Sequence, residues 1–146
     1  MKKVFLSILL TICTIALTNA QQNAIGLRLG FNRFGVAEAS YQRFVSDRNR
    51  FELDLGLDTG NSIHVSGIYQ WVWDLSQLEQ GFKWYAGPGV GLFLHESGMK
   101  IGLLGNLGIE YTFEFPLQVF IDIRPGFYTG KTDNIGGFAT GARWKF

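Results

Sequence analysis

The side chains with the clearest potential for chemistry belong to the segment His64-Val65-Ser66. A histidine and a serine two positions apart lie on one face of a β-strand, because strand side chains alternate between two faces. Asp54 and Asp58 lie in the preceding strand-like segment and could supply an acid. A serine activated by a histidine, which is itself oriented by an acid, is the nucleophile of many hydrolases. The pattern predicts a Ser-His-acid hydrolase as one candidate activity.

The H-x-S element resembles that of the outer-membrane lipid A deacylases, which are barrels of similar size and strand number. This resemblance implies a lipid-modifying hydrolase that uses His64 and Ser66. In that family the element lies late in the chain and faces the lipid, whereas here it lies in the fourth strand-like segment and alternation points it inward. No metal-ligand cluster, phosphate-binding loop or cofactor motif is found in the sequence. We therefore expect a protein without a cofactor and without enzymatic activity, and keep the hydrolase as an alternative.

A second set of chemically notable residues consists of charged side chains that share one face of the strand-like segments. Buried charges persist in proteins only when they are paired, so we expect a network of ion pairs that fills the interior of the fold. The alternative is a narrow polar path for water or small ions, for which glycines on the same face leave room. The bases are Arg28, Lys83, Arg124, Arg143 and Lys145, and the acids are Glu38, Glu52, Asp54, Glu110 and Asp122.

The segments that position these residues alternate between apolar residues and residues that are charged, polar or small. In the first segment Ile25, Leu27 and Leu29 alternate with Gly26 and Arg28. A period of two is typical of β-strands, and none of the apolar faces carries a charge. The eight expected strands cover residues 25–31, 37–42, 51–58, 64–73, 82–95, 101–113, 117–128 and 138–146.

The distribution of charge decides which face points inward. A soluble barrel keeps apolar residues inside, but here the apolar faces are broad and the opposite faces hold glycines and charges. This pattern is typical of a barrel in lipid, where charges face the lumen and closure pairs every backbone group. The segment lengths suit the ~9–11 residues of a tilted spanning strand. The expected fold class is all-β, an eight-stranded antiparallel up-and-down transmembrane β-barrel.

The first twenty residues have the layout of a secretory signal peptide. Lys2 and Lys3 precede an apolar stretch that ends in the small residue Ala20, as signal peptidase requires. Cleavage there would leave residues 21–146 as one barrel domain without cysteine, because Cys13 is the only cysteine. The remaining chain has 11 Lys and Arg residues and 12 Asp and Glu residues, and its basic residues form no cluster in the sequence. Nucleic-acid binding is therefore not expected.

Aromatic residues gather at the strand ends nearest to both termini, which we assign to the periplasmic membrane interface. The terminal sequence Gly-Ala-Arg-Trp-Lys-Phe resembles the C-terminal strand signature of outer-membrane proteins, which the barrel-assembly machinery recognises. Trp144 and Phe146 would carry this assembly signal. The expected belt contains Tyr41, Phe44, Phe51, Trp71, Trp73, Phe82, Trp84, Tyr111, Phe113, Phe115, Trp144 and Phe146, with Phe31, Phe34, Phe127 and Phe138 in a sparser outer ring.

With their size and strand number, residues 21–146 resemble the OmpA/OmpX-type family of eight-stranded outer-membrane barrels. The resemblance implies a location in the outer membrane of a Gram-negative-type envelope, contact with its lipids and lipopolysaccharide, and a structural or envelope role. The expected outer connections are all short, unlike the long loops usual in this family, which disfavours a receptor or adhesin. Pro88 lies in mid-strand, where a closed barrel has no free edge, so we expect a bulge or a lost hydrogen bond beside Gly87 and Gly89.

Overall fold

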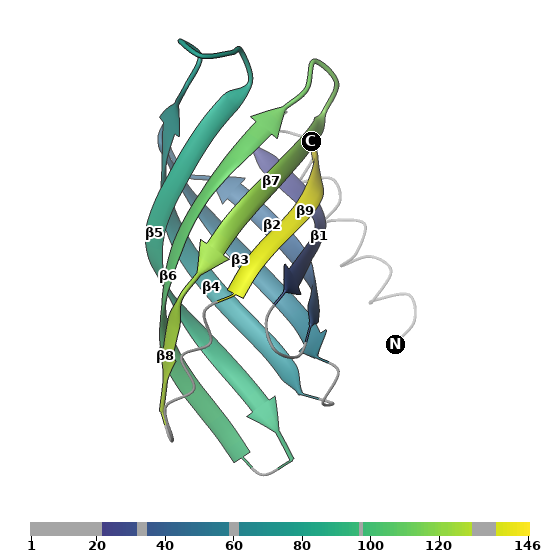
Figure 1. The fold of residues 1–146 in the computed structure, drawn as a ribbon, viewed down its shortest axis with the longest axis vertical. Helices are drawn as coiled ribbons and strands as arrows, with labels where there is room; N and C mark the ends of the chain where they lie inside the picture. The colour runs from purple at the N-terminus through teal and green to yellow at the C-terminus, as the bar shows by residue number, and fades with distance from the viewer. Residues whose placement is uncertain (1–21, 32–34, 59–61, 97, 130–136) are drawn as a thin grey trace, which may run out of the picture.

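The computed structural model describes residues 22–31, 35–58, 62–96, 98–129 and 137–146, which form one antiparallel sheet (Figure 1). The sheet runs in the order β5-β4-β3-β2-β1-β9-β7-β6-β8, and pairing of β5 with β6 closes it into a barrel. The strands are β1 (Asn23–Phe31), β2 (Val36–Phe44), β3 (Asn49–Asp58), β4 (Ile63–Asp74), β5 (Phe82–His95), β6 (Gly98–Thr112), β7 (Leu117–Arg124), β8 (Gly126–Tyr128) and β9 (Gly137–Lys145).

The segments β7 and β8 are two parts of a single strand. Pro125 separates them, yet both pair with β6 in one register, with Leu107 opposite Ile123 and Leu104 opposite Gly126. Because Pro lacks a backbone N–H, it interrupts the pairing without shifting it. The barrel therefore has eight antiparallel strands, and the predicted closed all-β architecture is confirmed.

Several of the predictions fall outside the described residues, among them the short outer connections expected near residues 32–35, 59–62 and 129–134. The signal peptide at residues 1–20 is another, so its cleavage after Ala20 stays a prediction. Phe34, which we expected in the outer aromatic ring, also lies outside them. Within the described ranges, no helix has the length and apolar character needed to cross a membrane.

Side chains alternate between a polar interior and an apolar exterior. In β1 the side chain of Leu27 is 64% exposed, whereas its neighbour Arg28 is 5% exposed. In β3 the same contrast separates exposed Leu55 from fully buried Asp54. The leucines do not converge on a common core, so the expected inside-out distribution of side chains is confirmed. The apolar or aromatic side chains that do lie inside fill space between the polar ones and include Ile68, Val72, Tyr85, Leu104 and Phe120.

Aromatic rings line the barrel end at which the described chain begins, before β1, and ends, after β9; this end is called the terminal end below. Trp73 and Trp84 stack with ring centroids 4.1 Å apart. Phe44 differs from the prediction, because it shares its strand face with Gln42 and its ring lies 5.5 Å from the guanidinium carbon of Arg50 in the interior. Phe44 therefore belongs to the lumen entrance and not to the outer belt. The other ring contacts at this end are Phe51–Tyr69, Tyr69–Trp71, Phe82–Tyr111, Tyr111–Phe113 and Phe113–Phe115.

Pairing between β4 and β5 lapses beside Pro88. Ile68 pairs with Gly89 and Trp71 pairs with Ala86, with no paired residues between these two points. The register is the same on both sides of the gap, so no residue is inserted and no bulge forms. Of the two outcomes expected from the sequence, the locally lost pairing is the one the structure shows. Because Pro88 has no backbone N–H, β5 cannot donate a hydrogen bond to β4 at this position.

Gly87 allows β4 and β5 to approach each other closely at this gap. A Cβ atom on Gly87 would lie 1.8 Å from the carbonyl oxygen of Tyr69, a backbone atom that can move only if the strands separate. We expect Gly87→Ala to lower the free energy of unfolding by about 1–3 kcal/mol, as overpacking usually does. Urea titration of the barrel in detergent micelles, followed by tryptophan fluorescence, measures this change.

Gly67→Ala is the matched control for this variant. Gly67 lies on β4 close to the same gap, but an added Cβ there meets no atom within 4 Å. Its effect should stay within about 0.5 kcal/mol, as for other unobstructed surface substitutions. Equal stabilities of the two variants would show that the strands can part at Gly87 without cost.

Candidate functional site

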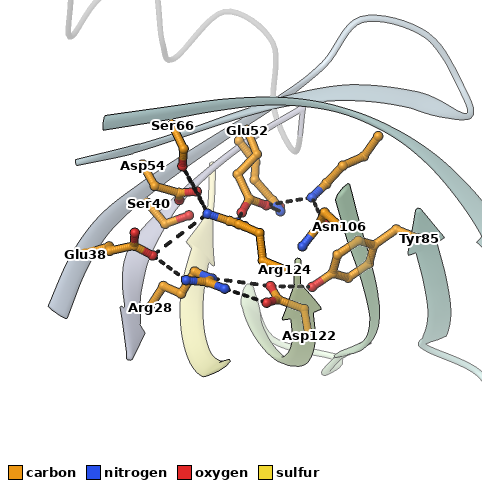
Figure 2. A network of polar contacts seen from close by, with 12 residues as sticks. Arg28, Glu38, Ser40, Glu52, Asp54, Ser66, Tyr85, Asn106, Asp122 and Arg124 are labelled. Carbon is orange, nitrogen blue, oxygen red and sulfur yellow. Dashed lines mark hydrogen bonds and ion pairs between the residues drawn. The ribbon is translucent and has the colours of Figure 1, made fainter. Parts of the chain in front are cut away.

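The polar interior of the barrel is centred on Arg124 (Figure 2). Its Nη1 lies 2.8 Å from Asp54 Oδ2, and its Nη2 lies 2.6 Å from Glu52 Oε1. The hydroxyl of Ser66 accepts a hydrogen bond from Arg124 at 3.0 Å and donates one to Asp54 at 3.3 Å. One guanidinium therefore joins strands β3, β4 and β7 across the lumen. All four side chains are buried.

A second arginine, Arg28 of β1, extends this network away from the terminal end of the barrel. Its guanidinium forms ion pairs with Glu38 of β2 and, at 2.7 Å, with Asp122 of β7. The hydroxyl of Tyr85, on β5, donates to Asp122 at 3.2 Å over the intervening strand β6. Figure 2 shows Arg28 between these two carboxylates, with Glu38 on one side and Asp122 on the other. His64 lies beside Glu38, with its Nδ1 3.1 Å from Glu38 Oε1.

Two further arginines occupy the half of the lumen nearer to the terminal end. Arg50 Nη2 lies 2.6 Å from Glu110 Oε2, and Arg143 Nη2 lies 3.0 Å from Glu52 Oε2. The guanidinium carbon of Arg143 also lies 3.6 Å from the ring centroid of Phe120. Such a cation–π contact is attractive because the face of an aromatic ring is electron-rich. These two arginines are fully buried.

Amide side chains connect the ion pairs to one another. Gln70 donates to Asn106 at 2.6 Å and to Glu52 at 3.1 Å, and its own oxygen accepts from Arg50 Nε at 2.6 Å. Gln42 donates to Glu52 at 2.6 Å. A buried polar group without a partner is costly, and these hydrogen bonds give the amides partners. They also connect the Arg50–Glu110 ion pair to the ion pairs of Glu52.

The structure places most of the predicted interior charges together but separates two of them. In the described part of the chain, Lys83 and Lys145 form no ion pair with a carboxylate, and both lie at the terminal end. Arg50 pairs with Glu110 in place of Lys83, although Lys83 is the strand neighbour of Glu110. The predicted residues that do come together are Arg28, Glu38, Glu52, Asp54, Glu110, Asp122, Arg124 and Arg143.

Sequence reasoning missed Arg50 because the expected strand began at residue 51, whereas β3 begins two residues earlier, at Asn49. The alternation of Glu52 and Asp54, extended back by two positions, would have placed Arg50 on the inward face. The amides of Gln42 and Gln70 were also on inward faces, yet uncharged residues gave no sign that they would join the network. The one signal for Arg50 in the sequence is its even spacing from Glu52 and Asp54, which puts all three side chains on the same face of the strand.

The arrangement of His64 and Ser66 is not that of a catalytic pair. Both side chains point inward, but the described contacts of His64 are with Glu38 and, through Nε2 at 2.9 Å, with the hydroxyl of Tyr128. Ser66 contacts Asp54 and Arg124 instead. The side chain of Asp58 lies outside the described atoms. No group of three or more potential metal ligands gathers within the described ranges.

The side chains of the network lie buried across the middle of the barrel. Each carboxylate that the described residues bury forms an ion pair with at least one arginine, as burial of charge demands. Away from the terminal end a cavity of about 30 Å³ lies beside Arg28, Glu38, His64 and Tyr128. A cavity needs roughly 10–15 Å³ to hold a water molecule, so this one has room for about one or two. The ion pairs of the network connect strands on different sides of the barrel.

The described residues form a closed eight-stranded antiparallel β-barrel with an apolar outer surface and buried polar and charged side chains inside. This is the fold of the OmpA/OmpX-type barrels. The N-terminal β-barrel domain of Pseudomonas aeruginosa OprF superposes with a TM-score of 0.71 at 13% identity, covering 88% of this chain and all of that one (100%).

Two other solved structures share this architecture. Neisserial surface protein A gives a TM-score of 0.61 at 15% identity, covering 85% of this chain and 94% of that chain. A de novo designed transmembrane β-barrel gives a TM-score of 0.67 at 12% identity, covering 88% and 98%. No family model matches the chain, and neither does any curated protein. The likeness therefore concerns the fold.

Proposed function

We propose that the protein is exported and spans the outer membrane of a Gram-negative-type envelope. In this proposal residues 1–20 are a cleaved signal peptide, and residues 21–146 form the barrel. The observation that carries it is the exposed apolar exterior around a charged interior, which is stable in hydrocarbon and unfavourable in water. The fold likeness to the OprF barrel domain and to Neisserial surface protein A supports the same location.

We propose a structural or envelope role, without enzymatic activity. The network holds the walls of the barrel together and fills the lumen, so the contacts favour a rigid membrane-embedded body over a transport path. Its partners would be outer-membrane lipids and lipopolysaccharide around the apolar exterior. The separate contacts of His64 and Ser66 give a hydrolase no support.

The C-terminal strand would carry the signal for assembly. Trp144 lies on β9 with its ring exposed on the outer surface. Phe146 continues the pairing of β9 with β1 through two backbone hydrogen bonds to Asn23, of 2.9 and 3.2 Å. We propose that the barrel-assembly machinery recognises Trp144 and Phe146 before this seam forms.

Fractionation of a Gram-negative host that expresses the full chain tests both parts of the proposal. We expect the protein in the outer-membrane fraction, with faster migration on a gel when it is not heated, as folded barrels show. The purified barrel should give no conductance in planar bilayers at any applied voltage, because Arg124 and its partners close the lumen.

The outcomes separate the alternatives. Recovery of the folded protein in the soluble fraction would refute the membrane location. Stable single-channel steps from the folded barrel would refute the closed lumen and favour the narrow pore for water or small ions.

A further inference from the structure

The barrel end where the described chain begins, at Gln22, and ends, at Phe146, opens into a cavity of about 270 Å³, here called the mouth cavity. It is much larger than the roughly 10–15 Å³ that one water molecule needs. Its walls come from Gln22, which precedes β1, from the end of β2 and the connection between β2 and β3, and from strands β5 and β9. The lining residues are Gln22, Phe44, Val45, Ser46, Asp47, Lys83 and Lys145.

The two lysines of the mouth cavity are the inward bases that the central network does not use. They come from β5 and β9, which do not pair with each other. Among the described residues, neither ammonium group lies within ion-pair distance of a carboxylate. Lys83 stands opposite Asp74 and Glu110 in the strand pairing, and its Nζ lies 6.0 Å from the ring centroid of Phe44. The next cation inward, Arg50, is already neutralised by Glu110.

The charge balance of the mouth cavity favours an anion. Its lining carries two lysines and one aspartate, so its formal charge is positive. Two ammonium groups that face one cavity repel each other. An anion between them would remove the repulsion, while the side chains of Gln22 and Ser46 can donate hydrogen bonds to its oxygens.

We propose that the mouth cavity binds a phosphate group, held by Lys83 and Lys145 and hydrogen-bonded by Gln22 and Ser46. Phosphate matches the site because its several acceptor oxygens can face two cations and two neutral donors at once. The group could belong to free phosphate or to the headgroup of an anionic lipid. The site goes beyond the structural role proposed above, since it depends only on residues at this end of the barrel.

Titration of the full-length folded barrel with inorganic phosphate tests the site. In micelles of a zwitterionic detergent without phosphate, we expect saturable amide chemical-shift changes at Phe44, Val45, Ser46, Lys83 and Lys145. The double variant Lys83→Gln/Lys145→Gln should bind phosphate at least about tenfold more weakly. Lys83→Arg/Lys145→Arg, which keeps both charges, should retain binding.

Lys100→Gln is the matched control, because Lys100 is an exposed lysine at the opposite end of the barrel. It removes the same charge and should leave phosphate binding unchanged. Migration of unheated samples on a gel shows that each variant is folded. Shifts that do not saturate, or that are equal in the wild type and the double glutamine variant, would overturn the proposal.

Nanodiscs of phosphatidylcholine alone, or with phosphatidylglycerol, identify the source of the phosphate when no free phosphate is added. Both lipids carry a phosphate, but only phosphatidylglycerol is a net anion. Shifts at the mouth cavity that require phosphatidylglycerol support an anionic lipid headgroup as ligand. Shifts that require free phosphate support a soluble ligand. Failure of both probes to shift these amides overturns the site.

Discussion

Replacing Arg124 by methionine should lower the free energy of unfolding by about 3–5 kcal/mol, the usual cost of leaving buried charges without their partner. The Arg124 guanidinium contacts both Glu52 and Asp54, and all three side chains are buried. Methionine is long and flexible but uncharged, so Asp54 would lose its arginine and lie beside Glu52, which would keep only Arg143. Urea-induced unfolding of the reconstituted barrel, followed by tryptophan fluorescence, gives the change directly.

Arg48→Met is the matched control for Arg124→Met. Arg48 is exposed in the connection between β2 and β3, where its backbone oxygen accepts from Val72 and would still do so in the variant. Its effect should stay within about 0.5 kcal/mol. Arg124→Lys should fall between the two, because lysine keeps the charge but loses the planar fork that reaches two carboxylates. A loss below about 1 kcal/mol for Arg124→Met would contradict the central role of Arg124.

Leu27→Arg should weaken folding into a lipid bilayer by about 2–4 kcal/mol, the cost of an arginine at the midplane of a barrel's lipid-facing surface. Leu27 lies in the middle of β1, and 64% of its side chain is exposed on the apolar exterior. Equilibrium refolding from urea into phospholipid vesicles measures the difference between the wild type and the variant.

This variant distinguishes a membrane barrel from a soluble one. In a water-soluble protein an exposed leucine can be replaced by arginine at little cost, usually within about 0.5 kcal/mol. Leu78→Arg serves as the control, since Leu78 is 78% exposed in the connection between β4 and β5 at the barrel end. Equal effects of Leu27→Arg and Leu78→Arg would refute the membrane-spanning placement of the strands.

The faces of the strands could be predicted from the sequence because alternation carries two kinds of information at once. The period of two predicts strands, and the restriction of charges to one face separates inside from outside. Thus Leu27 and Arg28, adjacent in the sequence, were assigned to opposite sides, where the structure places them. The lost pairing beside Pro88 was predictable for an equally local reason, its missing N–H.

The choice of partners inside the lumen could not be predicted in the same way. Alternation states that a side chain points inward but not how far it reaches along the barrel axis. Glu110 stands opposite Lys83 in the strand pairing, yet its ion pair is with Arg50 of β3 across the lumen. Partners on distant strands depend on the tilt of the strands and on side-chain length. For the same reason the sequence predicted no difference between Lys145, at the mouth, and Arg143, in the centre.

The span of the interior contacts along the chain has a consequence for the order of folding. Arg28 contacts Asp122, 94 residues away, and Arg143 contacts Ser40, 103 residues away. In an intermediate with only some of the strands inserted, these arginines would lie in the membrane without their partner residues, which leaves unpaired charge beside hydrocarbon. Strands that entered the bilayer one by one would each meet that barrier. Insertion and joining of β1 to β9 should therefore occur as one cooperative step, and a slow one, because contacts so distant in sequence delay folding.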